Sequence, residues 1–240
     1  MLSERKLGLY SILVSKSNGL TLKGFRSNPG VFTFLSYYSI NIADPDVDYN
    51  KFTAIGMDGI QTVIFGRMFQ LGRFERISFD FSSLASEVFK HHNQKNGKVV
   101  FIGSKTEDLA SFLKVVLKRY PRLHVVYKSD GYFDSKHESK IIRDVLSAEP
   151  DLIVLGMGTK RQDSLALDLW EESNKELQIF TCGGFFHQTA MSNGDYFPQI
   201  INRLNIRFLY RIFKEKGTIS KLFPDILYPL FFMYKLYRQK

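Results

Sequence analysis

Short apolar runs alternate with segments of helical length through the middle of the chain, and this alternation constrains the fold more than any other feature. The runs lie at residues 98–102 (KVVFI), 123–127 (LHVVY), 151–155 (DLIVL) and 177–181 (LQIFT). The segments between them, 107–120, 137–148 and 161–173, are predicted to be helices. Strands separated by helices of this length are expected to be parallel and joined by right-handed crossovers.

The same pattern extends toward the N-terminus, where we expect strands at 31–35 and 53–57 and helices at 60–70 and 83–95. The strand runs are apolar throughout, as in sheets that helices cover on both faces. The sequence therefore predicts a Rossmann-like, doubly wound α/β fold with a mostly parallel sheet.

The C-terminal segment has a different character. Residues 203–240 contain nine Lys or Arg and two acids, so most of the net charge of +9 is concentrated there. The run 222–237 (LFPDILYPLFFMYKLY) is also apolar and aromatic, and Pro224, Asp225 and Pro229 interrupt it. Such a segment is expected to lie in a membrane interface and not to span the bilayer. We therefore expect an α/β domain at 1–200, followed by a helical, basic and aromatic appendage at 201–240 that contacts an anionic membrane surface.

Two other interpretations of this appendage are open. A basic segment can bind nucleic acid, but one that is equally apolar favours a membrane, so no nucleic-acid partner is expected. The second alternative is a solvated cationic helix face that covers aromatic side chains of the core.

Composition limits the remaining classes. With 240 residues and 44% hydrophobic content, the chain can build a sizeable core as one large domain, with or without an appendage. Its single cysteine, Cys182, excludes a disulfide scaffold and suits a reducing compartment. We expect no signal peptide at the N-terminus, and no spanning helix, because no uninterrupted apolar run reaches about 18 residues.

Open α/β sheets bind ligands at the carboxyl ends of their strands, and glycines follow several of the predicted strands. Gly156 and Gly158 precede a helix start, so the backbone can turn sharply and leave free N–H groups facing a bound anion. Lys160 or Arg161 could add positive charge, and Gln162 offers an amide donor and acceptor. The other candidate turns contain Gly103, Tyr132, Gly183 and Gly184. Three glycine turns at successive strand ends favour a nucleotide-diphosphate site, although a plain tight turn is the alternative for each.

Asp58 is the acid that stands out, because it follows a predicted strand and precedes an apolar helix. A carboxylate at this position can accept a proton from a hydroxyl group. The competing interpretation is a helix N-cap, for which Asp is among the preferred residues.

Two parts of the sequence contain residues that could bind a metal, but no metal site is expected at either. The segment 43–50 (ADPDVDYN) contains overlapping Asp-x-Asp triplets that could hold a hard cation, but it reads as a solvated loop. The five histidines lack metal-ligand spacing, and of these only His187, after the last glycine pair, is a candidate to face the site.

The chain resembles the bacterial WecG/TagA/CpsF glycosyltransferases, glycosyltransferase family 26. The resemblance covers roughly residues 25–215 in the family's order. The matching stretches are TFLSYYS (33–39), MDGIQTV (57–63), RISFD (76–80), KVVFIGSK (98–105), DGYF (130–133), DLIVLGMGTKRQD (151–163), TCGGFFHQTA (181–190) and YFPQIINRLNIRFLYRIFKE (196–215).

The resemblance implies an enzyme that transfers a sugar from a UDP-sugar to a polyprenyl-diphosphate-linked acceptor, with inversion and without a bound metal or other cofactor. It further implies a cytoplasmic protein, peripheral on the inner face of the cell membrane, that serves cell-surface polysaccharide assembly. The implied donor sugars are of the N-acetylmannosamine, glucose or uronic acid class, and homo-oligomerisation is left open.

The family's site residues map onto this chain one by one. Asp58 matches the candidate general base, Thr33 the active-site threonine, and Arg76 and Arg211 functional arginines. Gln162 matches the glutamine of the motif Gly-x-Gly-x-Pro-x-Gln-Glu. The chain departs from the family pattern at Ser36 (Asn in the family), Lys160 (Pro) and Asp163 (Glu). The alternative function is a Rossmann-like nucleotide-binding or regulatory domain without transfer activity.

Overall fold

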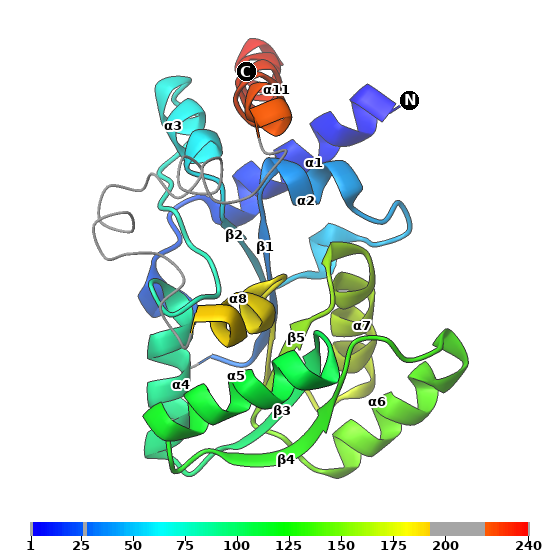
Figure 1. Cartoon of the computed structure of the whole chain (residues 1–240). Coiled ribbons are helices and arrows are strands. Elements are labelled where there is room, and N and C mark those ends of the chain that lie inside the picture. Colours follow the sequence, from blue (N-terminus) through cyan, green and yellow to red (C-terminus); the bar gives the residue numbers. More distant parts are fainter. Residues whose placement is uncertain (1, 26–27, 193–218, 240) are drawn as a thin grey trace.

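The computed structural model describes residues 2–25, 28–192 and 219–239 (Figure 1). Its strands are β1 (Gly30–Leu35), β2 (Ala54–Met57), β3 (Lys98–Gly103), β4 (His124–Ser129), β5 (Leu152–Gly156) and β6 (Gln178–Thr181). Its α-helices are α1 (Leu2–Ser17), α2 (Tyr37–Ile42), α3 (Ile60–Met68), α4 (Leu84–Gln94), α5 (Thr106–Arg119), α6 (Glu138–Ser147), α7 (Thr159–Glu172), α8 (Phe185–Ser192) and α11 (Ile219–Gln239). Short 3-10 turns lie at η1 (Leu22–Phe25), η2 (Tyr49–Lys51) and η3 (Ser135–His137).

The six strands form one sheet in the order β2-β1-β6-β5-β3-β4, and every pairing between neighbours is parallel. This confirms the predicted Rossmann-like α/β fold. The predicted strands and helices from residue 31 to residue 181 all form, with boundaries that differ by one or two residues. The agreement follows from the period of the apolar residues, which is the strongest signal of element type.

Alternate residues of each central strand point to opposite faces, so two separate clusters form the core. Along β5, Ile153 and Leu155 join the cluster under α1, α2, α3, α6, α7 and α11. Leu152 and Val154 join the cluster under α4, α5 and α8. All four of these side chains are fully buried, as a sheet covered on both faces requires.

The edge strand β4 departs from the expectation of burial on both faces. Its residues are alternately exposed and half-buried along the whole strand. The reason is its place at the end of the sheet order, where only β3 pairs with it. The run of apolar letters in LHVVY therefore does not distinguish a central strand from an edge strand.

Helix α1 was not predicted, and it packs against the C-terminal helix α11 (Figure 1). The rings of Tyr10 and Phe232 stack with their centroids 5.0 Å apart. Phe232 and Met233 are buried in the same cluster as Leu9, Tyr10 and Leu13. The C-terminal helix that the sequence predicted is therefore present, and part of its surface completes the core.

Helices α1, α3 and α11 gather at one end of the molecule (Figure 1). Among the described residues, no helix is long and apolar enough to cross a membrane. The division into a domain at 1–200 and an appendage at 201–240 stays a prediction, because its boundary lies outside the described residues.

Candidate active site

The chain leaves the neighbouring strands β3 and β5 toward opposite faces of the sheet. After β3 it enters α5, whose apolar side chains belong to one core cluster, and after β5 it enters α7, whose apolar side chains belong to the other. Strands that diverge in this way mark the switch point at which open α/β sheets bind their ligands. The carboxyl ends of β3 and β5 are therefore the place to examine first.

Gly103 ends β3 in a conformation that only glycine adopts readily. Its φ is +144°, and a Cβ atom there would lie 2.3 Å from the carbonyl oxygen of Gly156. The next residue, Ser104, donates its N–H to the same carbonyl oxygen at 2.9 Å and accepts the N–H of Gly131 at 2.9 Å. Three of the predicted ligand-binding turns are thus joined backbone to backbone.

Two further glycines lie where the described residues leave space for a ligand. Gly158 (φ +82°) is the N-cap residue of α7, Gly183 (φ +55°) follows β6, and no atom of the described residues lies within 4 Å of a Cβ built on either. Gln162 is buried and accepts the N–H of Gly183 through Oε1 at 3.0 Å. Gln162 therefore fastens the turn after β5 to the turn after β6, and its predicted contact with substrate stays a prediction. Gly184 lies in the same turn, against Gln188.

Asp58 and Arg76 meet at the carboxyl end of β2. The guanidinium donates from Nη2 to Asp58 Oδ1 at 2.6 Å and from Nε to the Asp58 carbonyl oxygen at 2.9 Å. Arg76 Nη2 also lies 3.9 Å from a carboxylate oxygen of Asp80. The Asp58 side chain is 40% exposed, whereas that of Arg76 is only 15% exposed. The largely buried guanidinium therefore holds a carboxylate that solvent can reach.

The helix-cap interpretation of Asp58 is wrong. The N-cap residue of α3 is Gly59, and no side chain makes a cap hydrogen bond there. Within the described part of the chain, no hydrogen bond reaches Asp58 Oδ2. This oxygen can therefore accept a proton or a hydrogen bond from an incoming hydroxyl group.

Thr33 is placed inside the protein and not at its surface. The side chain is fully buried in β1, donates to Asp163 Oδ1 at 2.9 Å and accepts from Thr181 Oγ1 at 2.8 Å. Tyr49 donates its hydroxyl to the other carboxylate oxygen of Asp163 at 2.8 Å. The sequence analysis missed this network; the available signal was an acid, Asp163, on the apolar face of the predicted helix.

Arg161 makes contacts that the sequence did not predict, and whether it or Lys160 adds charge at the site stays a prediction. It donates to the carbonyl oxygens of Gly131 and Phe133 at 3.1 and 2.9 Å, and its guanidinium lies 4.6 Å from the centroid of the Phe133 ring. Its charge therefore holds the loop after β4 against α7. In that loop the predicted substrate contact Tyr132 is 73% exposed.

The Asp-x-Asp segment forms local turns. Asp44 accepts the backbone N–H of Asp46, and Asp48 caps η2 by accepting the N–H of Asn50. In the ranges described, no group of three His, Cys, Asp or Glu side chains is arranged to hold a metal ion. The remaining predicted site residue, Arg211, lies outside the described residues.

With this geometry in hand, comparison with known proteins identifies the family. The family model described as "Glycosyl transferase WecG/TagA/CpsF family" matches residues 38–240. The chain belongs to this family. A curated relative from Shigella boydii, "UDP-Gal:alpha-D-GlcNAc-diphosphoundecaprenol beta-1,4-galactosyltransferase", is 36% identical over 208 residues, which cover 84% of each chain. The predicted hexosyltransferase class is thereby confirmed.

Two of the departures from the WecG/TagA/CpsF pattern have visible structural roles. Ser36 forms a reciprocal capping box with Ser39 at the start of α2, directly after β1. Asp163 occupies the buried position between Thr33 and Tyr49 described above, and burial raises the pKa of its carboxyl to about 7. The shorter acid is thus satisfied by hydroxyl donors from two other elements.

Asp163 should make the stability of this WecG/TagA/CpsF member dependent on pH. Because folding raises the pKa of this carboxyl from 3.8 to about 7, its contribution to stability is greatest below pH 4 and is lost as the pH rises toward 7. Asp163→Asn removes the titration. The free energy of unfolding of the variant, measured with urea, should rise relative to wild type by about 1 kcal/mol per pH unit between pH 4.5 and pH 7. A difference that stays constant over this range would contradict the assignment.

Proposed function

We propose that the protein is an inverting glycosyltransferase that moves a sugar from a UDP-sugar to a polyprenyl-diphosphate-linked acceptor in bacterial cell-surface polysaccharide assembly. The observation that carries the proposal is the Asp58 carboxylate, held by Arg76 at the end of β2 beside the glycine turns of the same sheet edge. Family membership supports the reaction class, and the name of the Shigella boydii relative supports a lipid-diphosphate acceptor.

The order of the strands indicates how the UDP-sugar would lie along the carboxyl ends of the sheet. Neighbouring strands lie about 4.8 Å apart, so the end of β2 is about 10 Å from the end of β6 and further from β5 and β3. The diphosphate would bind at the glycine turns after β6, β5 and β3. The sugar would extend toward β1 and β2, where Asp58 lies.

In the proposed step, the acceptor hydroxyl attacks the anomeric carbon as the bond from that carbon to the diphosphate oxygen breaks. Asp58 takes the hydroxyl proton, and the electron pair of the breaking bond goes to the diphosphate. A single displacement of this kind inverts the anomeric configuration. Arg76 fixes the rotamer of Asp58 through Oδ1 and leaves Oδ2 for the hydroxyl.

We further propose that the negative charge on the leaving diphosphate is stabilised without a metal ion. The N-terminus of α7, which begins after Gly158, would supply free N–H groups, and an arginine of the C-terminal segment such as Arg211 would add charge. The carboxylates of Asp44 and Asp48 in the Asp-x-Asp segment are engaged in local turns, which supports this proposal.

The experiment that tests the function is transfer from radiolabelled UDP-sugars to a GlcNAc-diphosphate-lipid analogue. UDP-galactose, UDP-glucose, UDP-N-acetylmannosamine and a UDP-uronic acid form the donor panel, each assayed with and without EDTA. Transfer from one donor in both conditions supports the proposal. Transfer from none would contradict it and favour the alternative of a nucleotide-binding domain without transfer activity. Loss of activity in EDTA, with recovery in Mn²⁺ and dependence on Asp46, would contradict the metal-free step.

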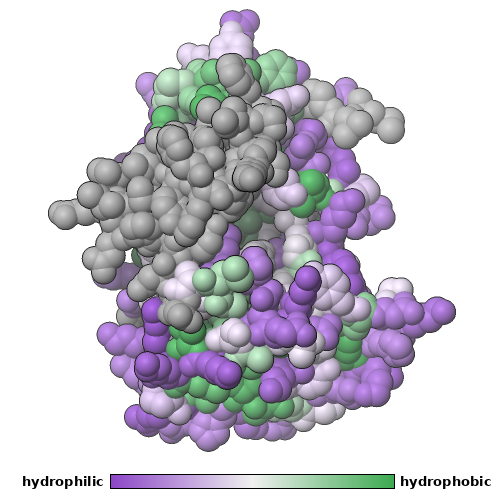
Figure 2. All heavy atoms as spheres, viewed as in Figure 1, coloured by the Kyte–Doolittle hydropathy of each residue, from purple (hydrophilic) through white to green (hydrophobic). Residues whose placement is uncertain are grey.

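A lipid-linked acceptor requires contact with a membrane, and one end of the molecule suits it. Exposed apolar and aromatic side chains gather on α11 and on α2 and α3, each of which contacts α11 (Figure 2). This end surface consists of Tyr38, Ile64, Met68, Leu227, Tyr228, Phe231, Tyr234 and Tyr237, each 43% exposed or more. Lys235 and Lys6 lie over the rings of Phe231 and Tyr228, so cations accompany the aromatic side chains.

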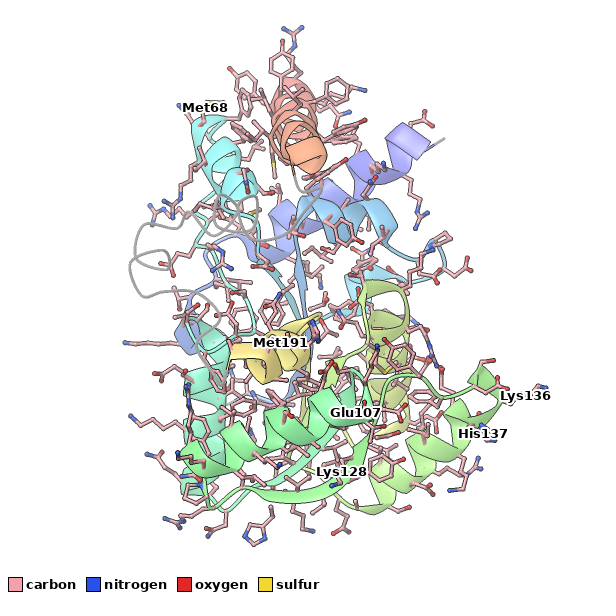
Figure 3. The ribbon with its side chains drawn as sticks, in the orientation of Figure 1. Met68, Glu107, Lys128, Lys136, His137 and Met191 are labelled. Carbon is pink, nitrogen blue, oxygen red and sulfur yellow. The ribbon has the colours of Figure 1, made fainter. Side chains whose placement is uncertain are left out.

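We propose that this end surface binds the inner face of the cell membrane, because aromatic and cationic side chains together favour an anionic interface. Ile64 and Met68 belong to α3, so the surface extends beyond the C-terminal segment named by the sequence analysis. Met68 lies at the outer end of α3, the helix that α11 contacts (Figure 3).

Replacing Ile64 and Met68 by Ser should weaken binding to vesicles that contain anionic lipid about tenfold. The variant would lose two exposed apolar side chains that insert into the membrane interface, and with them part of the free energy of binding. Co-sedimentation at low and high salt measures the effect. Val126→Ser removes an apolar side chain from the distant edge strand β4 and serves as the control. Equal binding by the double variant and wild type would show that α3 does not take part.

A further inference from the structure

A histidine and a carboxylate form a hydrogen-bonded pair at the same sheet edge, and the proposed mechanism does not yet use it. His187 Nδ1 lies 2.8 Å from Asp108 Oδ2, and Ser104 donates its hydroxyl to the same oxygen at 3.2 Å. His187 lies in the first turn of α8, after β6, whereas Asp108 lies in the first turn of α5 and Ser104 directly follows β3. The pair therefore links the two strand exits on either side of β5.

The protonation of the ring follows from its partner. A carboxylate accepts hydrogen bonds only, so Nδ1 must carry a proton and donate it to Asp108. The hydrogen bond from His187 lowers the pKa of the Asp108 carboxyl, with the Ser104 hydroxyl acting in the same direction. Asp108 thus remains ionised and fixes the orientation of the ring through Nδ1. The second nitrogen, Nε2, is left for a ligand on a side chain that is 60% exposed, and it donates an N–H whenever a bound phosphate brings a second proton to the ring.

The backbone of His187 is fixed close to the glycine turns. The preceding residue, Phe186, is fully buried, and its ring centroid lies 4.3 Å from that of Phe112 on α5. A Cβ built on Gly156 would lie 3.1 Å from the Phe186 ring. The first turn of α8 is therefore packed against the turn after β5 on one side and against α5 on the other, with little freedom to move His187 away.

Ser104 adds a sign of strain at this point. It has φ +59°, a conformation that costs a non-glycine residue free energy, and its N–H and hydroxyl both make hydrogen bonds. Strained residues of this kind are concentrated at functional sites. The strain, the oriented histidine and the glycine turns after β3, β5 and β6 coincide at one edge of the sheet.

We propose that His187, oriented by Asp108, binds the β-phosphate of the nucleotide sugar through Nε2–H. This inference rests on the proposed function. As the bond between the anomeric carbon and the diphosphate oxygen breaks, the electron pair passes to the diphosphate, and the hydrogen bond from the imidazolium strengthens. His187 keeps its proton, and the acceptor's proton goes to Asp58. Asp108 is a positioning residue, because it acts through His187.

The test compares binding of UDP and UMP to the full chain by titration calorimetry. His187→Gln should weaken UDP binding at least about tenfold, the size expected for a charge-assisted hydrogen bond, and leave UMP binding within about twofold because UMP lacks the β-phosphate. His137→Gln is the matched control, since His137 is exposed on η3, far from α8 (Figure 3). Asp108→Asn should weaken UDP binding in the wild-type background and have no further effect in His187→Gln.

Three outcomes would overturn the inference. Unchanged UDP binding by His187→Gln, with transfer intact in wild type, would overturn it and leave the proposed function standing. Equal losses for UDP and UMP would show general disruption of the site, and not a contact with the β-phosphate. A wild-type protein that binds no UDP and uses no UDP-sugar would overturn the proposed function and this inference together.

Discussion

Asp58→Asn is expected to lower kcat for sugar transfer by about 10²–10⁴-fold, the usual contribution of a general base. The amide keeps the shape of the carboxylate and can still accept a hydrogen bond from Arg76, but it cannot take a proton from the acceptor. KM for the donor should change little, because the diphosphate is bound elsewhere along the sheet edge. Steady-state kinetics with the donor identified in the panel would measure both parameters.

The control for this substitution is Asp46→Asn, which removes an exposed carboxylate from the loop before η2. Its activity should match that of wild type. The Asp58–Arg76 ion pair could also stabilise the fold, so the melting temperatures of both variants are needed. If Asp58→Asn melts like wild type and turns over within about threefold of it, Asp58 is not the base.

Gly103→Ala is expected to destabilise the protein by about 3 kcal/mol or more. The new methyl group would lie 2.3 Å from the carbonyl oxygen of Gly156, and φ at this position is +144°. Backbone strain and a clash with another backbone are both costs that side-chain rotation cannot relieve. Urea unfolding followed by circular dichroism would measure the loss, and UDP binding should fall with it because the turns after β3 and β5 share this contact.

Gly8→Ala provides the opposite result within the same chain. Gly8 is an exposed residue inside α1, and among residues 2–25, 28–192 and 219–239 no atom outside its own helix backbone lies within 4 Å of a Cβ built there. Alanine should therefore stabilise the helix by up to about 1 kcal/mol. If Gly103→Ala unfolded at the same urea concentration as wild type and Gly8→Ala, the close contact of the β3 and β5 turns would be refuted.

The sequence predicted the sheet well because each central strand is a short apolar run between helices with a clear period. It did not predict the contact between Asp58 and Arg76, since 18 positions separate them and no local pattern connects them; the family resemblance named each residue separately. The physical cause of their contact is a bridge that continues the sheet, in which Met57 pairs with Arg76. A single bridge of this kind produces no alternation of apolar and polar residues in the sequence, so it cannot be recognised there.

The buried network could not be predicted for a related reason. Thr33 and Asp163 are 130 positions apart, and an acid on a helix is usually interpreted as solvated. Its burial follows from the packing of α7 on β1 and β6, which depends on tertiary structure. The contacts of Arg161 were not predicted either. A cation at a helix start suggests a bound anion, whereas Arg161 donates hydrogen bonds to two carbonyl oxygens of the loop after β4.

The packing of α1 against α11 has a consequence for how the protein is made. Helix α1 has an apolar face, with Tyr10 and Leu13, that is completed by Phe232 and Met233 of α11, a helix far later in the sequence. That face stays uncovered until α11 has been synthesised, so this part of the core cannot close before then. The α/β sheet between the two helices can form earlier, because its strands and crossover helices follow one another along the chain. Nascent chains that still lack α11 should accordingly be the forms that chaperones and proteases engage.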